Sequence, residues 1–490
     1  MTDVSRTAVD LEEPEDDPGA TGTGWETVIG LEVHCELATA TKLFCGCRNA
    51  FGDEPNSNVC PVCLGLPGSL PVLNRAAVEL AMRLGEALDC RIEPSVFARK
   101  NYFYPDMPKD YQVTQYDRPV TVDGELRLPD GTIVGIERAH LEEDTGKSTH
   151  VGGGGRIHDA EYSLIDYNRA GVPLVEIVSR PDLRSAEEAR AYVNELRAVL
   201  LATGVSDARM EEGSMRVDAN ISVRQAGGPL GTRCEIKNLN SVRSLGRAID
   251  EETRRQIALL EAGDRVIQET RHWNEAEGRT SSMRSKEEAY DYRYFPEPDL
   301  VPVAPDDAWR AAVAAGLPPL PAARRDVLAE ATGVPPAAVA LVVERGLDDF
   351  VLAALVAGGD ARRLLNHAEH DLAGGAGRLD PATFARLTRM EADGDLTSTQ
   401  GRTVLATLVA EGGDPEEVAR AAGFEAMGGD ALAAAVDQVI AANPDAFERY
   451  RAGDAKVTGF FVGQVMKATR GQADGKAVTA LLQARASAGR

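Results

Sequence analysis

Apolar residues alternate strictly with Gly or polar residues between Ile29 and Leu37. Ile29, Leu31, Val33, Cys35 and Leu37 fall on one side, and Gly30, Glu32, His34 and Glu36 fall on the other. A period of two predicts a β-strand with one face on a core. Residues 216–224 repeat the pattern, with Val217, Ala219, Ile221 and Val223 facing in and Arg216, Asp218, Asn220, Ser222 and Arg224 facing out. We therefore expect Glu32 and His34 to share one outward face.

A helix is predicted between these two strands. The run from Ser185 to Glu188 is typical of a capping box, and Gly204 is a suitable stop. The intervening apolar residues have helical spacing: Ala189, Tyr192, Val193, Leu196 and Leu200. Strands and helices alternate without a regular βαβ period, which favours an α+β fold built on a mixed or antiparallel sheet.

The pattern changes after Asp299, where prolines become frequent. Beyond residue 325 the chain is rich in Ala and Leu at helical spacing, with Gly-rich breaks at 358–359, 374–377 and 412–413. We expect four parts: an acidic disordered tail at 1–24, an α+β cradle domain at 25–299, an all-α helical domain at 300–411 and a small helical tail domain at 412–490.

Charge is unevenly distributed over the 490 residues. The net charge of −24 argues against a nucleic-acid binder, because phosphate contacts require Lys and Arg. However, residues 1–24 hold seven acidic side chains and one basic one, whereas residues 449–490 hold eight basic and two acidic. The C-terminal part is therefore either a basic binding patch or a solvated helix face.

The remaining composition indicates an ordinary cytoplasmic protein. No stretch approaches the roughly 18 apolar residues that span a bilayer, and the first residues lack the order of a secretion signal. Seven cysteines are too sparse for a disulfide framework.

Four of the cysteines form the sharpest motif. They are arranged as two close pairs on either side of a loop rich in Gly, Asn and Pro: Cys45 and Cys47, then Cys60 and Cys63. This spacing suits a structural, tetrahedral Zn²⁺ site that would fasten the loop 44–65. Free thiols are the alternative.

A second cluster is acidic. Glu32 and His34 share a strand face, Glu143 lies in an acidic segment from 136 to 149, and Glu176 lies in an apolar strand. Carboxylates with one imidazole suit Mg²⁺ or Mn²⁺ holding a nucleotide phosphate. The alternative is a set of unrelated surface acids and a satisfied core histidine.

One nucleotide-binding motif and two hydrolase motifs can be excluded. A P-loop ending at Lys147 would need glycine where Leu141 stands. The chain contains neither a Gly-Gly-Ser-Ser amidase run nor a G-x-S-x-G elbow.

Aromatic residues interleaved with basic residues occur at 99–115 and 291–295. They either stack on a nucleotide base or pack around proline turns.

Longer stretches identify a family resemblance. WETVIGLEVH, RKNYFYPDMPK, HLEEDTGKSTH, NRAGVPLVEIVS, MEEGSMRVDANISVR, DYRYFPEPDL and GFFVGQVMKATRG resemble the B subunit of the GatCAB aminoacyl-tRNA amidotransferase over residues 25 to about 485. The resemblance implies an α+β cradle, a helical domain and a YqeY-like tail. It also implies a ligase that uses ATP and Mg²⁺ to activate Glu on tRNA(Gln), or Asp on tRNA(Asn), as an acyl phosphate. Ammonia from a glutaminase A subunit then displaces phosphate, and a small C subunit completes the complex.

The resemblance also implies residue roles. His34, Glu143 and Glu176, with Glu32 beside them, match catalytic Mg²⁺ positions. Lys147, Arg216, Asp218, Asn220, Lys237 and Asn238 are candidates for the phosphate and aminoacyl pocket, and Lys456, Lys467, Arg470 and Lys476 for contacts with the tRNA. A competing hypothesis is that the chain is a non-catalytic tRNA-binding scaffold of the same complex. Clustered carboxylates favour the catalytic one.

Overall fold

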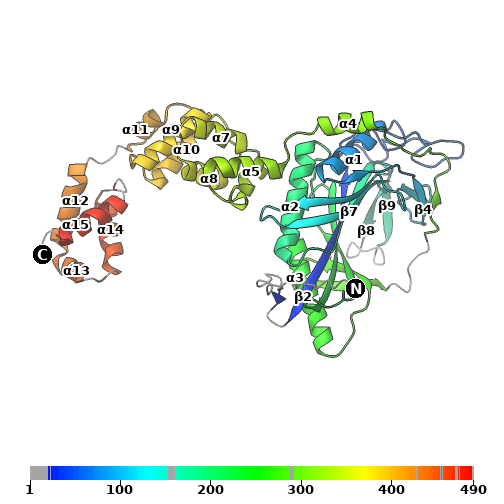
Figure 1. The fold of residues 1–490 in the computed structure, drawn as a ribbon, viewed down its shortest axis with the longest axis horizontal. Helices are drawn as coiled ribbons and strands as arrows, with labels where there is room; N and C mark the ends of the chain where they lie inside the picture. The colour runs from blue at the N-terminus through cyan, green and yellow to red at the C-terminus, as the bar shows by residue number, and fades with distance from the viewer. Residues whose placement is uncertain are drawn as a thin grey trace, which may run out of the picture. The chain divides into compact units, whose positions relative to one another are not determined.

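The computed structural model describes residues 20–21, 24–152, 160–285, 292–424, 429–452, 454, 456–469, 473 and 475–487. The expected disordered tail at 1–24 lies almost wholly outside these residues. The chain divides into two compact units, Met1–Ala322 and Ala323–Arg490. Each unit is coloured along the chain in Figure 1.

The first unit is built on a 13-stranded sheet. Its main order is β14 (Arg279–Ser285), β13 (Glu269–Asn274), β12 (Cys234–Leu239), β11 (Met215–Gln225), β2 (Trp25–Glu36), β10 (Pro173–Ser179), β7 (Ile133–Glu143), β5 (Tyr111–Thr114), β4 (Ala98–Asn101) and β15 (Phe295–Pro296). Short strands β1 (Ala20–Thr21), β3 (Arg91–Ile92) and β6 (Thr121–Arg127) pair beside this path, and β8 (Lys147–Val151) pairs with β9 (Tyr162–Asp166) as a separate hairpin. Among the described strands, only the pair β12–β13 is parallel, so the predicted mixed α+β class is confirmed.

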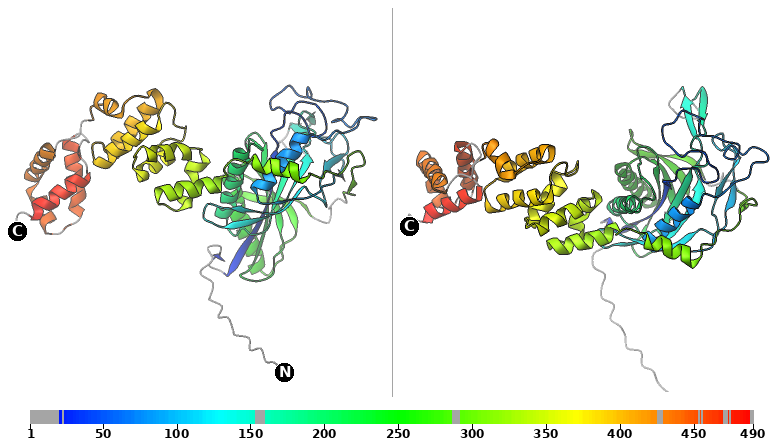
Figure 2. Two further views of the ribbon diagram at one scale, coloured as in Figure 1. Left: turned by 45° about the horizontal axis from the view of Figure 1, so that its top comes forward. Right: turned by 90° about the horizontal axis from the view of Figure 1, so that it is seen from above.

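Three helices cover one face of this sheet: α1 (Arg75–Ala87), α2 (Ala186–Thr203) and α3 (Val242–Glu261) (Figures 1 and 2). Their apolar faces bury the inward side chains of β2, among them Ile29, Leu31 and Val33, at 1% exposure or less. Because neighbouring side chains of a strand point to opposite faces, Glu32 and His34 lie on the face away from these helices. The predicted alternation is confirmed.

The ends of α2 agree with the sequence in most respects. The Ser185 hydroxyl accepts from the Glu188 backbone N–H at 3.1 Å, and Gly204 ends the helix at φ +67°. The Glu188 carboxylate accepts from the backbone N–H of Arg184 at 2.7 Å, one residue before the predicted partner. The Glu188 side chain therefore bonds to the residue that precedes the N-cap, and not to the N-cap itself.

The first unit extends beyond the predicted boundary at residue 299. Helix α4 (Asp307–Ala315) follows the proline-rich run, and Val303 and Val313 belong to the core beneath the sheet. The segment from residue 300 through α4 therefore packs on the first domain.

The second unit is helical, as expected. Its helices are α5 (Pro321–Thr332), the 3₁₀ helix η3 (Pro336–Val339), α6 (Ala340–Glu344), α7 (Asp348–Val356), α8 (Ala361–His370), α9 (Pro381–Asp393), α10 (Ser398–Glu411), α11 (Pro415–Ala421), α12 (Gly429–Ala442), α13 (Pro444–Arg451), α14 (Lys456–Ala468) and α15 (Gly475–Ser487). Within the described residues no single helix is long and apolar enough to cross a membrane; the bent pair Pro321–Thr332 and Pro336–Glu344 passes by length and composition only.

Two separate apolar cores occur in this unit. One runs from Leu328 to Ala419, and the other from Leu432 to Leu482. Because Ala419 of α11 lies in the first of these cores and Phe424 packs against it, the tail domain begins after residue 424, later than the predicted 412.

Candidate active site

One row of polar side chains crosses the centre of the sheet, on the face without helices. The register places His140 of β7 opposite Glu176 of β10, Glu176 opposite His34 of β2, and His34 opposite Arg216 of β11. Four strands that are far apart in sequence therefore supply one continuous row. Glu176 binds both imidazoles, with its carboxylate 3.3 Å from His140 Nε2 and 3.5 Å from His34 Nε2.

The second carboxylate beside His34 belongs to Glu142, whose Oε1 lies 3.6 Å from His34 Nε2. His34, Glu142 and Glu176 each offer one atom to a group spanning no more than 4.8 Å. The sequence prediction placed Glu143 here, and the structure corrects it by one residue. Ala139 and Leu141 of β7 are buried in the core, so Glu142 has the parity of the outward face and Glu143 does not. That alternation was the signal available in the sequence.

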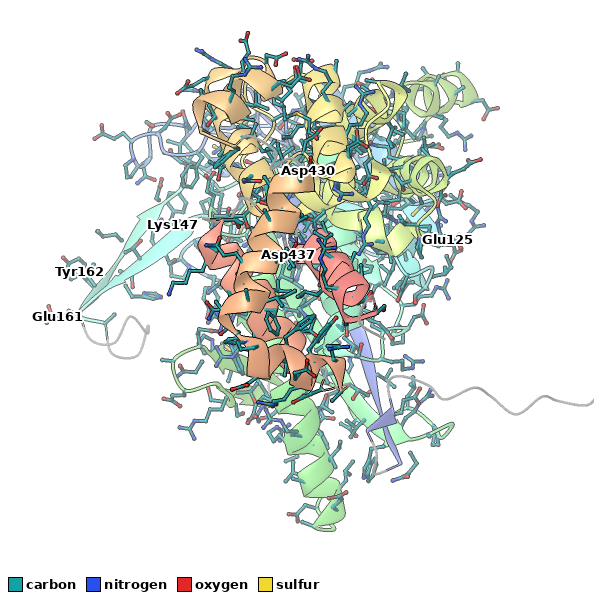
Figure 3. The ribbon with its side chains drawn as sticks, turned by 90° about the vertical axis from the view of Figure 1, so that its left-hand side faces the viewer. Glu125, Lys147, Glu161, Tyr162, Asp430 and Asp437 are labelled. Atoms are coloured by element: carbon teal, nitrogen blue, oxygen red, sulfur yellow. The ribbon has the colours of Figure 1, made fainter. Side chains whose placement is uncertain are left out.

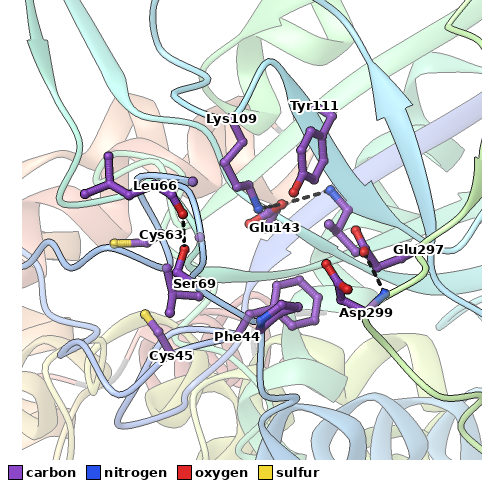
Figure 4. Close-up of a pocket in the computed structure, with 15 residues that line it drawn as sticks. Phe44, Cys45, Cys63, Leu66, Ser69, Lys109, Tyr111, Glu143, Glu297 and Asp299 are labelled. Carbon is purple, nitrogen blue, oxygen red and sulfur yellow. Dashed lines mark hydrogen bonds and ion pairs between the residues drawn. The ribbon is translucent and has the colours of Figure 1, made fainter.

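Glu143 lies in a neighbouring pocket instead (Figure 4). Its carboxylate accepts from the ammonium of Lys109 and from the backbone N–H of Val113, the latter at 2.8 Å. Both charged side chains are nearly buried, at 3% exposure for Glu143 and 9% for Lys109. Glu143 is thus an ion-paired, hydrogen-bonded carboxylate at the end of β7, beside the cysteine loop.

The electrostatics of the row favour positive charge between the carboxylates. Burial lowers the pKa of His34, but Glu176 and Glu142 reverse this effect and raise it to about 9. Burial raises the pKa of Glu176, and the two imidazoles overcome it, leaving that pKa below its usual range. Burial, Glu176 and Glu235 raise the pKa of Glu32. This is the pattern expected where carboxylates crowd one site.

A cleft of about 520 Å³ lies over the row. Besides the carboxylates and imidazoles, it is lined by Lys100, Tyr292 and Tyr294, which belong to the segments that the sequence offered for base stacking. Arg138 and Tyr116 also line it, and the sequence did not assign them to the site. Acid, base and aromatic groups in one concave site are typical of a nucleotide-handling centre.

Several predicted pocket residues do surround this row. Asn220 donates to the Glu32 carboxylate at 2.9 Å, and Lys237 binds Asp218 at 2.7 Å. Arg216 binds Asp144 at 3.0 Å, at the end of β7. Lys237 also lines the cleft. These side chains orient one another beside the carboxylates.

Two predicted residues lie elsewhere. Asn238 has a left-handed backbone at φ +70°, and its amide donates to the Trp273 carbonyl at 3.0 Å, which is a structural role in the sheet. Lys147 is exposed on the β8–β9 hairpin, which stands out from the body of the unit (Figure 3). The structure does not bring either one to the cleft.

The His34, Glu142 and Glu176 set fits a hard divalent cation. Two carboxylates and one imidazole supply oxygen and nitrogen donors without sulfur. In addition, Nδ1 of His140 is buried without a hydrogen-bond partner within the described residues. A buried polar atom left unpaired next to a charged cluster is more typical of a binding site than of a finished core.

The four cysteines Cys45, Cys47, Cys60 and Cys63 converge as predicted, with all their sulfurs within 4.8 Å. Tetrahedral Zn²⁺ at about 2.3 Å from each sulfur would set the sulfurs about 3.8 Å apart. The Cys60 and Cys63 sulfurs are 3.9 Å apart, and the Cys60 backbone N–H donates to the Cys63 sulfur at 3.1 Å. A hydrogen bond from Cys45 lowers the pKa of Cys63 to about 5. The donor set fits zinc.

The predicted tRNA-binding side chains are only partly described. Lys467 is exposed near the end of α14. Lys456 and Lys476 lie in α14 and α15, but their side chains are outside the described part, and so is the whole of Arg470.

Comparison with known proteins matches nearly the whole chain. A sequence model of the GatB/GatE catalytic domain matches residues 27–311, and one of the GatB domain matches residues 342–485. The chain is 52% identical to the B subunit of the aspartyl/glutamyl-tRNA(Asn/Gln) amidotransferase of Frankia casuarinae, covering 94% of this chain and 95% of that protein. For the proteins of the same name from Salinispora arenicola and Thermobifida fusca the identity is 50%, with 95% and 97% coverage for the first and 92% of both chains for the second. The chain therefore belongs to the GatB family, the B subunits of aspartyl/glutamyl-tRNA(Asn/Gln) amidotransferases.

Proposed function

We propose that this chain activates the side-chain carboxylate of Glu on tRNA(Gln), of Asp on tRNA(Asn), or of both, and that it converts the activated group to the amide. The observation that carries the proposal is the convergence of His34, Glu142 and Glu176 within 4.8 Å in a cleft that also holds cationic side chains. A protein that only held tRNA in place would have no use for buried carboxylates gathered in this way, because their desolvation is costly.

The chemistry explains why such a site is needed. A carboxylate is a poor electrophile, so its oxygen first attacks the γ-phosphorus of ATP, forming a C–O–P bond and releasing ADP. Ammonia then adds to the acyl carbon, the C–O bond to phosphate breaks, and the amide and inorganic phosphate leave. The charge on the transferred phosphoryl group must be stabilised by positioned cations.

The chain's residues divide this work. His34, Glu142 and Glu176, with Glu32 beside them, would hold Mg²⁺, which neutralises phosphate charge when it is bound. The ammonium of Lys100 lies over the Tyr292 ring at 4.9 Å and lines the cleft. It is positioned to contact phosphate oxygens as a compact charge.

The same proposal includes three further components. A glutaminase A subunit supplies ammonia, because this chain carries neither the Gly-Gly-Ser-Ser run of amidases nor a G-x-S-x-G elbow. A small C subunit completes the complex, and the basic side chains of the tail domain bind the tRNA body, supported by the exposed Lys467. Structural Zn²⁺ fastens the cysteine loop. Since aminoacylated tRNA is made and consumed in the cytoplasm, we place the complex there.

The test uses the B–C pair without the A subunit. It is supplied with ATP, Mg²⁺, misacylated tRNA and free ammonium, and we expect amidated tRNA together with ADP. If no product forms and no ATP is consumed, the kinase assignment fails and the scaffold hypothesis replaces it. His34→Ala should abolish ADP formation while tRNA affinity changes less than twofold. His370→Ala, at an exposed imidazole of α8, is the matched control and should behave as wild type.

A further inference from the structure

We propose that Tyr116 and Tyr294 form a stacking platform for an adenine base inside the cleft. The inference rests on the proposed function, because that reaction brings two adenines to this site. One is the base of ATP, and the other is the terminal adenosine at the 3′ end of the tRNA. Both present the same flat purine ring, so the chemistry of recognition is shared and only the source differs.

The two tyrosine rings are stacked almost in parallel. Their centroids are 3.9 Å apart and their planes differ by 9°. Tyr116 follows β5 and Tyr294 precedes β15, so the contact joins segments that are far apart in the chain. Although one face of Tyr116 is covered by Tyr294, the residue is still 58% exposed. A large planar surface is therefore left open in the cleft that both rings line.

This exposure separates the pair from aromatic contacts that serve packing. In the core of the same unit, Phe44 and Phe97 meet edge to face and are 4% and 1% exposed. Isolated aromatic pairs prefer edge-to-face or offset contacts over a close face-to-face arrangement. A parallel pair with one open face suits a third flat ring, which would extend the stack.

The platform is supported from behind. Tyr294 contacts Tyr292 edge to face at 6.0 Å, and Tyr292 contacts Tyr102 in the same way at 6.3 Å. Lys100 lies over the Tyr292 ring at 4.9 Å. These contacts restrain Tyr294, so a base that stacks on Tyr116 meets a surface that is already ordered and loses less entropy on binding.

The platform and the carboxylates belong to one cleft. Besides burial and Tyr292, the carboxylates of Glu142 and Glu176 raise the pKa of Tyr294, so its hydroxyl lies within their electrostatic range. A nucleotide bound in this cavity can therefore present its phosphates to His34, Glu142 and Glu176 and its base to the platform, because both groups of residues line it. Stacking is tolerant of base identity, because every base has a π face.

The experiment measures binding directly in the complete complex of the A, B and C subunits. The variants are Tyr116→Ala, which removes the ring, and Tyr116→Phe, which keeps it. Tyr162→Ala is the matched control, because Tyr162 is 55% exposed but lies on the β8–β9 hairpin and does not line the cleft. One arm measures the Kd of the imido analogue of ATP with Mg²⁺. The other compares the Kd values of uncharged tRNA ending in CCA and in CC.

Removing a base-stacking aromatic ring weakens binding by about 5- to 150-fold. If the base is that of ATP, Tyr116→Ala raises the nucleotide Kd by at least about fivefold and leaves tRNA binding unchanged. If it is the RNA end, the wild-type complex prefers the CCA end, and Tyr116→Ala removes that preference while the nucleotide Kd stays the same. In either case Tyr116→Phe and Tyr162→Ala resemble wild type.

If Tyr116→Ala leaves the Kd unchanged in both arms, the proposal is overturned, and Tyr116 and Tyr294 serve only in packing. A loss that Tyr116→Phe shares also overturns it, because the hydroxyl would then be the important group. Neither arm requires turnover, so the outcome is independent of whether the complex phosphorylates a carboxylate. Failure of the proposed function would appear only in the ADP and amidation assays.

Discussion

Glu142 and Glu143 are neighbours in β7, yet their carboxylates serve different sites. Glu142 lies 3.6 Å from His34 in the cleft, and Glu143 is paired with Lys109 beside the cysteine loop. The peptide bond between them therefore joins a candidate metal ligand to a buried ion pair. Neighbouring side chains of a strand point to opposite faces, so these two identical carboxylates lie in different environments.

This separation predicts distinct consequences for two matched substitutions. Glu142→Gln should raise the Mg²⁺ concentration for half-maximal ADP formation by at least about tenfold, because it removes a charged ligand. Glu143→Gln should instead lower the free energy of unfolding by about 3 kcal/mol, because Lys109 loses its buried partner. Mg²⁺ titrations of ADP formation measure the first effect, and urea unfolding measures the second, in both variants. Equal Mg²⁺ requirements would contradict the assignment of Glu142.

Metal analysis tests the cysteine cluster. We expect about one zinc per chain, and less after Cys45→Ser, because a tetrahedral thiolate site needs all four ligands. Cys90→Ser is the control, since Cys90 is buried outside the cluster. A zinc content near zero in the wild-type protein, or one that is unaffected by Cys45→Ser, would contradict the site.

The same cluster predicts a role for Lys42. This lysine is fully buried, and its ammonium donates to the Tyr167 carbonyl at 3.2 Å. No carboxylate in the described part of the chain forms an ion pair with it. Four thiolates around Zn²⁺ carry a net charge of −2, which Lys42 would partly offset, as its effect on the pKa of Cys63 indicates. Lys42→Met should therefore speed zinc loss to a chelator by roughly 10- to 100-fold. An unchanged rate would argue for a packing role.

A pH dependence is expected in the helical unit. His367 of α8 binds Asp371 at 2.7 Å and Glu391 of α9 at 3.0 Å, and these acids also face Arg402 of α10 and Arg363. Burial lowers the pKa of His367, but the two carboxylates raise it overall above 6.5. The stabilisation is therefore complete below about pH 6.5 and is lost as the pH rises through the higher folded pKa.

Hydrogen exchange in peptides from α8 and α9 measures this effect. Protection relative to His367→Gln should be greatest near pH 6 and should shrink toward pH 9. His370→Gln, on the exposed side of the same helix, should follow wild type at every pH. A constant difference between wild type and His367→Gln would show that the ring contributes through packing alone.

The tail domain is best tested by truncation after Phe424. Removing residues 425–490 should weaken tRNA binding and reduce the slope of log K against log salt by about 0.7–0.9 for each phosphate that the tail domain neutralises. A cut after Glu411 would also remove Ala419, which belongs to the preceding core, and would confuse instability with weaker binding. If removing residues 425–490 leaves the salt slope unchanged, the basic residues of the tail domain form a solvated surface and do not bind tRNA.

The local sequence pattern was sufficient to predict much of this structure. The alternation in β2, the start and stop of α2 and the cysteine convergence all follow from residues close in sequence. Each is governed by short-range geometry: strand period, cap chemistry and tight turns. The family resemblance supplied the catalytic candidates, and the parity of β7 was the local evidence that could have separated Glu142 from Glu143.

Other features depend on which strands become neighbours. Nothing near Tyr116 in the sequence indicates that Tyr294 will cover it, and Lys147 could not be placed on a separate hairpin from its own surroundings. Asn238 shows the same limit: its positive φ and its bond to Trp273 reflect the sheet around it. Long-range pairing decides these positions, and one sequence alone carries little of that information.

The central position of β2 has a consequence for folding during synthesis on the ribosome. One of its edges pairs with β1 and β10 and the other with β11, and β11 begins about 180 residues after β2 ends. At roughly 5–20 residues per second, a ribosome needs on the order of 10–40 s to synthesise that interval. Until β10 and then β11 emerge, the nascent chain carries a strand with open pairing edges, which is an aggregation hazard. Folding of the central sheet therefore cannot be completed until β11 has been synthesised.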